Sequence, residues 1–157
     1  MKIGIILPHL GNTQLAYQTI CHVNYLIDQQ SKNTFALFYE DLVQPTITPL
    51  CSTFPISNIW DFNDGHLIST TINNTITMGN STSTSRKFFY VWDLEWMRDN
   101  NRNFLYNIRA FNNPNIELIT RSTSHALAVR NFSNRESTVI ENMNLIKFID
   151  IYKEKNE

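Results

Sequence analysis

Two carboxylates and two indoles stand together in the segment Trp92–Trp96, the most unusual stretch of the chain. Carboxylates accept hydrogen bonds from sugar hydroxyl groups, and indole faces pack against the C–H faces of sugars. Asp93 and Glu95 would share one face if the segment were extended. The segment therefore favours a carbohydrate-binding surface. In the alternative, the indoles belong to the core, Asp93 caps the next turn and Glu95 is solvated.

His9 stands directly before a long predicted helix, where a histidine could act as a general base or bind a ligand hydroxyl. The alternative is a loop histidine that hydrogen-bonds the backbone. Gly11 and Asn12 could present helix N-terminal amides to an anion. The dinucleotide fingerprint Gly-x-Gly-x-x-Gly and the P-loop are both absent from the sequence, so nucleotide binding at this turn has weak support.

A third group of polar residues, Arg121 to His125, follows the next-to-last predicted strand. Arg121 and Ser122 are candidates for substrate contact, although Ser122 is also explained as a helix cap. His125 falls in the first turn of that helix and is interpreted as structural. The four histidines are not paired at helical spacing, and the two cysteines are Cys21 and Cys51. We therefore expect no metal site, and we expect no cofactor.

Strands and helices alternate along the chain in the way needed to position these residues. Strands are expected at Lys2–Leu7, Phe35–Tyr39, Asn58–Phe62, His66–Ser69, Phe88–Trp92, Ile116–Ile119 and Ser137–Glu141. The prolines of the segment Gln44–Pro55 predict irregular structure. Helices are expected from an Asn12 or Thr13 cap to about Gln30, at Thr71–Met78 and Asn103–Phe111, from Ser122 to about Phe132, and at the C-terminus on the face of Leu145, Phe148, Ile149 and Tyr152.

Short apolar runs that alternate with helices imply a parallel sheet with right-handed crossovers. We expect a single α/β domain over residues 1–157. It should be a Rossmann-like three-layer sandwich with a mostly parallel sheet of five to seven strands, and Phe88–Trp92 should be an interior strand. Ligands of such sheets bind beyond the carboxyl ends of the strands, where His9 and Asp93 could converge. Other positions directly after expected strands are Glu40-Asp41, Ser69-Thr70 and Asn142.

Charge and hydropathy exclude several classes of partner. Thirteen Lys and Arg against fourteen Asp and Glu give a net charge of -1, which is no electrostatic footprint for nucleic acid or an anionic membrane. No apolar run approaches the length of a membrane span. The apolar run Ile3–Leu7 ends at Pro8 and is too short for an export signal, so we expect a cytoplasmic location with reduced thiols.

Three stretches resemble a known family. The opening Lys2–Pro8, followed by a short loop and a long helix, resembles the start of GT-B glycosyltransferases. The stretch Ile119–Ala126 is similar to the strand–Ser–helix segment near the close of that family's N-terminal domain. The stretch Val139–Phe148 is similar to the family's V-I-P-N-G-V-D-x-x-x-F. In that stretch Asn142 and Phe148 match, whereas Glu141 and Met143 stand where the family has proline and glycine.

The resemblance implies an acceptor-side half of such an enzyme. The chain ends about nine residues after Phe148, and no two glutamates are spaced as in the family's Glu-x7-Glu pair, so the donor-binding half is expected to be missing. Sugar transfer from a nucleotide-sugar would then need a separately encoded donor-binding partner or a homodimer. By this resemblance, the catalytic residues are His9 and Asp93, and the substrate-binding residues are Gly11, Asn12, Glu95, Trp96, Arg121 and Ser122.

Two rival functions stay open. The chain could be a non-catalytic module that kept the fold and binds a glycan or a partner protein. It also resembles small orphan proteins of large tailed phages, which implies a viral structural or host-interaction role. A small nucleotide-binding or flavodoxin-like domain is the third hypothesis, and the missing phosphate loop counts against it.

Overall fold

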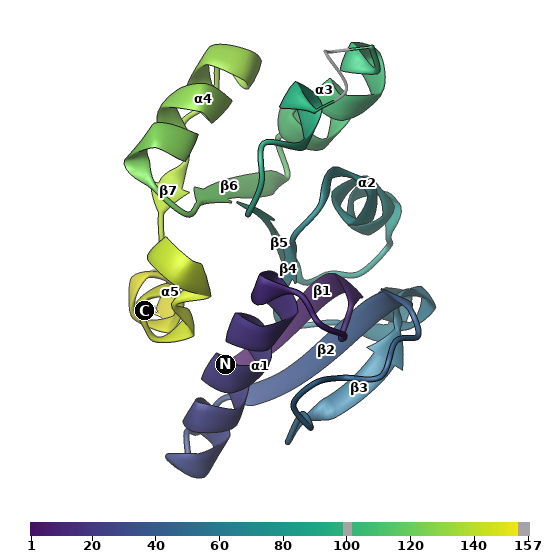
Figure 1. Cartoon of the computed structure of the whole chain (residues 1–157), viewed down its shortest axis with the longest axis vertical. Helices are drawn as coiled ribbons and strands as arrows, with labels where there is room; N and C mark the ends of the chain where they lie inside the picture. The colour runs from purple at the N-terminus through teal and green to yellow at the C-terminus, as the bar shows by residue number, and fades with distance from the viewer. Residues whose placement is uncertain (99–101, 154–157) are drawn as a thin grey trace.

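The computed structural model describes residues 1–98 and 102–153. Within these ranges the chain forms one seven-stranded sheet with the order β3-β2-β1-β4-β5-β6-β7, and every pair of neighbouring strands is parallel (Figure 1). The strands are β1 (Lys2–His9), β2 (Thr34–Asp41), β3 (Ser52–Pro55), β4 (His66–Ser69), β5 (Arg86–Val91), β6 (Ile116–Thr120) and β7 (Thr138–Val139). The expected α/β Rossmann-like three-layer sandwich is confirmed.

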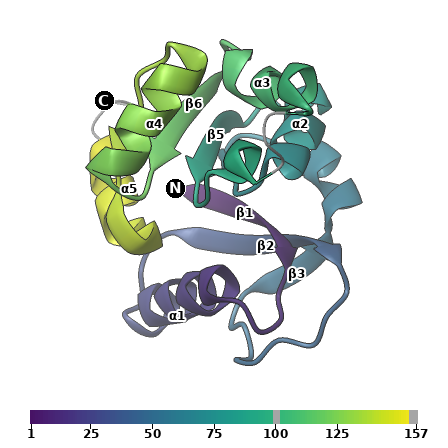
Figure 2. The same cartoon turned by 45° about the horizontal axis from the view of Figure 1, so that its top comes forward.

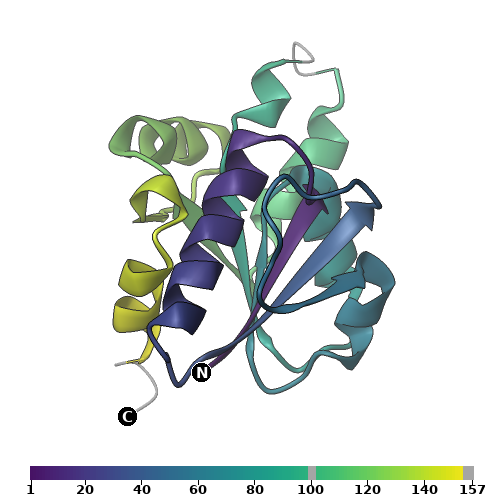
Figure 3. The same ribbon diagram turned by 60° about the horizontal axis from the view of Figure 1, so that its bottom comes forward.

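Helices cover both faces of the sheet, as Figures 1 and 2 show. One face packs against α1 (Gln14–Asp28) and α5 (Leu145–Lys153), which lie side by side (Figures 1 and 3). The other face packs against α2 (Ile72–Asn80), α3 (Phe104–Asn112) and α4 (Thr123–Ser133). Strand residues alternate between these two cores, as the pleat requires. None of the helices in the described residues is long and apolar enough to cross a membrane.

Three helices begin at hydroxyl side chains in the loops that follow strands. The Thr13 hydroxyl accepts the N–H of Ala16 at 3.2 Å and caps α1. Thr71 and Asn74 form a capping box at the start of α2. Ser122 caps α4, as the sequence predicts. These caps fix the helix N-termini at the carboxyl edge of the sheet, where their amide groups face the strand-end loops.

The sequence-based prediction is wrong around β3. Four of the five residues of the expected strand Asn58–Phe62 instead belong to the 3-10 helix η1 (Ile56–Asp61), and Phe62 directly follows it. Ile59 and Phe62 are the buried apolar residues of the expected strand, and their spacing suits a helical turn better than a strand. β3 lies inside the segment that was expected to be irregular. All four of its residues are exposed, so no hydrophobic pattern marks it, and backbone pairing with β2 defines it.

The centre of the sheet is predicted more accurately. β5 lies between β4 and β6, so the expected interior strand is confirmed. The segment after it is not extended, because the 3-10 helix η2 (Glu95–Met97) follows, and Asp93 and Glu95 do not share a strand face. The expected strand Ser137–Glu141 reduces to the two residues of β7, followed by the 3-10 helix η3 (Glu141–Met143).

Candidate functional site

The carboxyl group of Glu95 lies on the N-terminus of α2. Its Oε1 accepts the backbone N–H of Ile72, the first residue of that helix, at 2.9 Å. Burial raises the pKa of Glu95 to about 7, and the negative charges of Asp93 and Glu40 add to this, while the hydrogen bond from Ile72 lowers the pKa. A carboxyl group with such a pKa exchanges its proton near neutral pH, which is the requirement for general acid–base chemistry.

A second carboxyl group, Glu40, is held nearby at the end of β2. Its Oε1 accepts the side-chain amide of Asn73 at 2.9 Å, and the Tyr106 hydroxyl donates to Oδ1 of the same Asn73 at 2.8 Å. Burial is the main cause that raises the pKa of Glu40. We call Glu40, Asn73, Glu95 and Tyr106 the Glu40–Glu95 site. Its four members come from β2, α2, the segment after β5, and α3.

The loop after β1 is packed tightly. Nδ1 of His9 accepts the N–H of Gly11 at 3.1 Å, which is the backbone contact expected of a structural histidine. Gly11 is buried, and a Cβ atom placed on it would lie 2.5 Å from Cγ1 of Val43. A side chain of the β2–β3 loop therefore fills the space beside Gly11. Asn12 is exposed, and the helix cap is Thr13.

Asp93 and Trp96 have local partners. Asp93 accepts the N–H of Leu94 at 2.9 Å and forms an ion pair with Arg98. The Trp96 indole is buried and stacks on Phe132, with ring centroids 4.4 Å apart. Asp93 therefore bonds to its own segment, and Trp96 belongs to the core beneath α3 and α4, as the alternative interpretation expects of the indole. The same interpretation expects a solvated Glu95 and is wrong there, because Glu95 is half-buried and accepts the Ile72 N–H.

Arg121 and Ser122 lie at the end of β6, beside the end of β5. The Arg121 guanidinium lies over the Trp92 ring, 4.6 Å from its centroid, and Ser122 Oγ is 2.9 Å from His125 Nδ1. Burial lowers the pKa of His125; the positive charge of Arg121 lowers it further, and Asp93 opposes both. The structure thus brings Arg121, Ser122 and Asp93 to the edge that also carries Glu95, whereas His9 is engaged by its own loop.

Sequence reasoning assigned a role to Glu95 and counted Glu40 among the positions directly after expected strands without assigning it a role. It left out Asn73 and Tyr106. Asn73 and Tyr106 had no signal, because their contacts join residues about thirty positions apart. No group of three or more His, Cys, Asp or Glu side chains in residues 1–98 and 102–153 is arranged to hold a metal ion.

Comparisons with known proteins found no match. No protein-family model matches the sequence, and neither a curated protein nor a solved structure matches the chain.

Proposed function

We propose that the chain is a glycosyltransferase-like acceptor-side domain that binds a hydroxyl-rich acceptor at the Glu40–Glu95 site. The observation that carries the proposal is the raised pKa of Glu95, about 7, on the N-terminus of α2. In its ionised form Glu95 can accept an acceptor hydroxyl proton, and in its protonated form it can donate a hydrogen bond. Asn73 and Tyr106 add amide and phenol groups of the kind that bind sugar hydroxyls.

Backbone geometry near the C-terminus supports the family resemblance. Met143, which stands where the family's stretch has glycine, has a φ of 54°, and Asn142 has a φ of 51°. These are left-handed conformations, which glycine adopts most readily. A turn that keeps this backbone shape after losing its glycine is what descent from the family would leave.

Catalysis in this proposal needs a second domain that forms the other side of the cleft. A GT-B cleft lies between an acceptor half and a donor half, so we expect this chain alone neither to hydrolyse nucleotide-sugars nor to bind them tightly. A separately encoded donor-binding protein or a second copy would complete the cleft.

A non-catalytic binding module is the alternative, and one group of contacts favours it. His9 accepts a hydrogen bond from its own loop, Asp93 pairs with Leu94 and Arg98, and Val43 fills the space beside Gly11. Residues so engaged can shape a surface for a glycan or a partner protein, for example in a viral particle, without taking part in a reaction.

A glycan array, followed by titration calorimetry with the best oligosaccharide, tests the proposal. We expect saturable binding that weakens about tenfold or more in Glu95→Ala, because a half-buried hydrogen-bonding group is lost. Glu141→Ala is the matched control, since Glu141 is an exposed carboxylate, and it should bind like the wild type. Absence of glycan binding, or equal binding by both variants, would refute a glycan site here.

Binding assays with nucleotide-sugars test whether the chain is an acceptor-side half. Tight stoichiometric binding of UDP- or GDP-sugars by the isolated chain would contradict the acceptor-side assignment. Sugar transfer that appears only when a donor-half protein is added would favour the enzyme over the binding module.

A further inference from the structure

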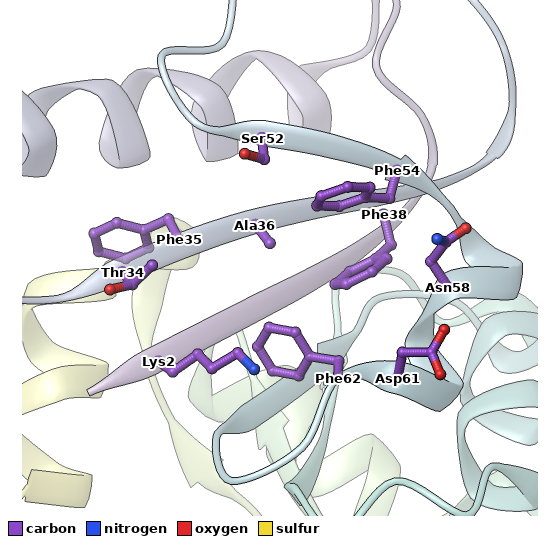
Figure 4. Close-up of a pocket in the computed structure, with 10 residues that line it drawn as sticks. All are labelled: Lys2, Thr34, Phe35, Ala36, Phe38, Ser52, Phe54, Asn58, Asp61 and Phe62. Carbon is purple, nitrogen blue, oxygen red and sulfur yellow. The ribbon is translucent and has the colours of Figure 1, made fainter.

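A groove of about 340 Å³ lies on the sheet face beside β1, β2 and β3, away from the Glu40–Glu95 site (Figure 4). Parallel register places Ala36 of β2 opposite Ser52 of β3. Both side chains are small, so the sheet surface is low at this row. Towards β1 the row ends at Gly4, above which the side chains of Leu67, Phe38 and Phe62 fill the space, and towards β3 it is exposed.

Three phenylalanines close one end of the groove. Phe38 contacts Phe54, with ring centroids 5.9 Å apart, and it meets Phe62 edge to face at 5.5 Å. Phe54 keeps 38% of its surface exposed, and Figure 4 shows its ring at the groove beside that of Phe38. A planar aromatic ring can stack or pack edge-on against such a wall, in the geometry that aromatic pairs prefer.

The two charged groups of the groove, Lys2 and Asp61, stand on either side of the Phe62 ring (Figure 4). Lys2 Nζ lies over that ring, 4.3 Å from its centroid, and donates to the carbonyl of Asn63 at 3.0 Å. An ammonium group has three donors, so donors remain for a ligand. The Asp61 side chain lines the groove on the other side of the ring.

We propose that this groove binds a small planar aromatic carboxylate. Its ring would pack against Phe54 and Phe62, and its carboxylate would pair with Lys2. The Asp61 charge repels an anion at the opposite side and so orients the ligand. The volume suits a small-molecule site, and an apolar lining with a few polar groups is the usual composition of one. The groove begins at the first residues of β1, β2 and β3, so this proposal is independent of the carboxyl-edge site.

Titration of 15N-labelled protein with 2-naphthoate, followed by NMR, tests the proposal. We expect saturable shifts of the Lys2, Ala36 and Phe54 amides. The neutral 2-naphthamide should bind about threefold or more weakly, because an exposed ion pair is worth this much. Saturated decahydronaphthalene-2-carboxylate should also bind more weakly, since it has no aromatic face.

Three variants separate specific binding from non-specific apolar contact. Ala36→Leu should fill the low row and abolish the shifts. Lys2→Gln should weaken the binding of 2-naphthoate to the affinity of 2-naphthamide. Lys147→Gln is the matched control, because Lys147 is an exposed lysine on α5, on the other face of the sheet. The proposal is overturned if no saturable shifts arise up to about 10 mM. It is also overturned if Ala36→Leu and Lys2→Gln both bind like the wild type.

Discussion

The Tyr90 hydroxyl, near the end of the interior strand β5, accepts the backbone N–H of Met143 at 2.9 Å. The same hydroxyl donates to the carbonyl of Ile140 at 2.6 Å, and Tyr90 is 2% exposed. One phenol therefore satisfies two backbone groups of the turn that leads into α5. His22 of α1 contacts the Met143 carbonyl from the other side, at 2.8 Å. This turn is fixed to both the sheet and the first helix.

Tyr90→Phe should destabilise the fold by about 2–3 kcal/mol. It leaves the Met143 N–H and the Ile140 carbonyl buried without a partner, and each such group costs about 1–3 kcal/mol. Urea unfolding followed by circular dichroism measures the change. Tyr106→Phe is the matched control: it also loses a phenol hydrogen bond, but an exposed one, so it should cost less than about 1 kcal/mol. Equal losses in the two variants would contradict the structural role of Tyr90.

Gly11→Ala should destabilise the protein through Val43. The added Cβ would lie 2.5 Å from Val43 Cγ1, so the Val43 side chain or the β2–β3 loop that carries it must shift, at a cost of about 1–2 kcal/mol. Val43→Ala alone should cost little, because Val43 is 41% exposed. In the double variant the Gly11→Ala penalty should fall by half or more. A double-mutant cycle from thermal unfolding gives the coupling, and strictly additive effects would show that the two residues do not meet.

Glu95→Gln should change how stability depends on pH. The folded-state pKa of Glu95 is raised from 4.5 to about 7, so the folded protein holds a proton that the unfolded chain releases. Stability from this carboxyl group is complete below pH 4.5 and is lost as the pH rises through about 7. The loss should be about 1–2 kcal/mol, less than full linkage because water screens the partly exposed group.

The glutamine variant keeps an oxygen that can accept the Ile72 N–H but cannot ionise. Its stability relative to the wild type should therefore increase from pH 4.5 to above 7. Denaturant unfolding at a series of pH values measures this difference, with Glu141→Gln as an exposed control that should follow the wild type. A constant difference between Glu95→Gln and the wild type would mean that Glu95 ionises normally in the folded protein.

The central part of the fold was predictable because burial leaves a pattern in the sequence. Phe88, Phe89, Tyr90 and Val91 are all fully buried or nearly so, as an uninterrupted apolar run requires. The edge of the sheet carries no such pattern. The residues of β3 are all exposed, and its pairing with β2 consists of backbone hydrogen bonds that any residue except proline can donate.

The candidate site was predictable only at its strand ends. Topology alone places Glu95 and Arg121 at the carboxyl edge, since both follow strands. Whether a side chain faces a ligand or its own backbone depends on local geometry, and His9 turns to the N–H of Gly11. The Glu40–Asn73–Tyr106 chain of hydrogen bonds depends on how α2 and α3 pack, which no local pattern reports.

His66→Phe should remove a pH dependence of stability that is opposite in sign to the one caused by Glu95. His66 is 8% exposed and stacks on Phe88, and neither ring nitrogen has a hydrogen-bond partner among the residues that the structure describes. Burial lowers its pKa from 6.5; the positive charges of Arg86 and the N-terminus lower it further, and Glu117 opposes them. Below pH 6.5 the unfolded chain takes up a proton that the folded protein does not bind. The free energy of unfolding therefore decreases as the pH is lowered. Phenylalanine keeps the stack without titrating, so the stability of the variant relative to the wild type should rise as the pH falls below 6.5.

At about pH 8, where both side chains are neutral, the two proteins should differ by less than about 1.5 kcal/mol. Denaturant unfolding at both ends of this range checks the prediction, and parallel pH profiles for the two proteins would show that His66 titrates normally in the folded state.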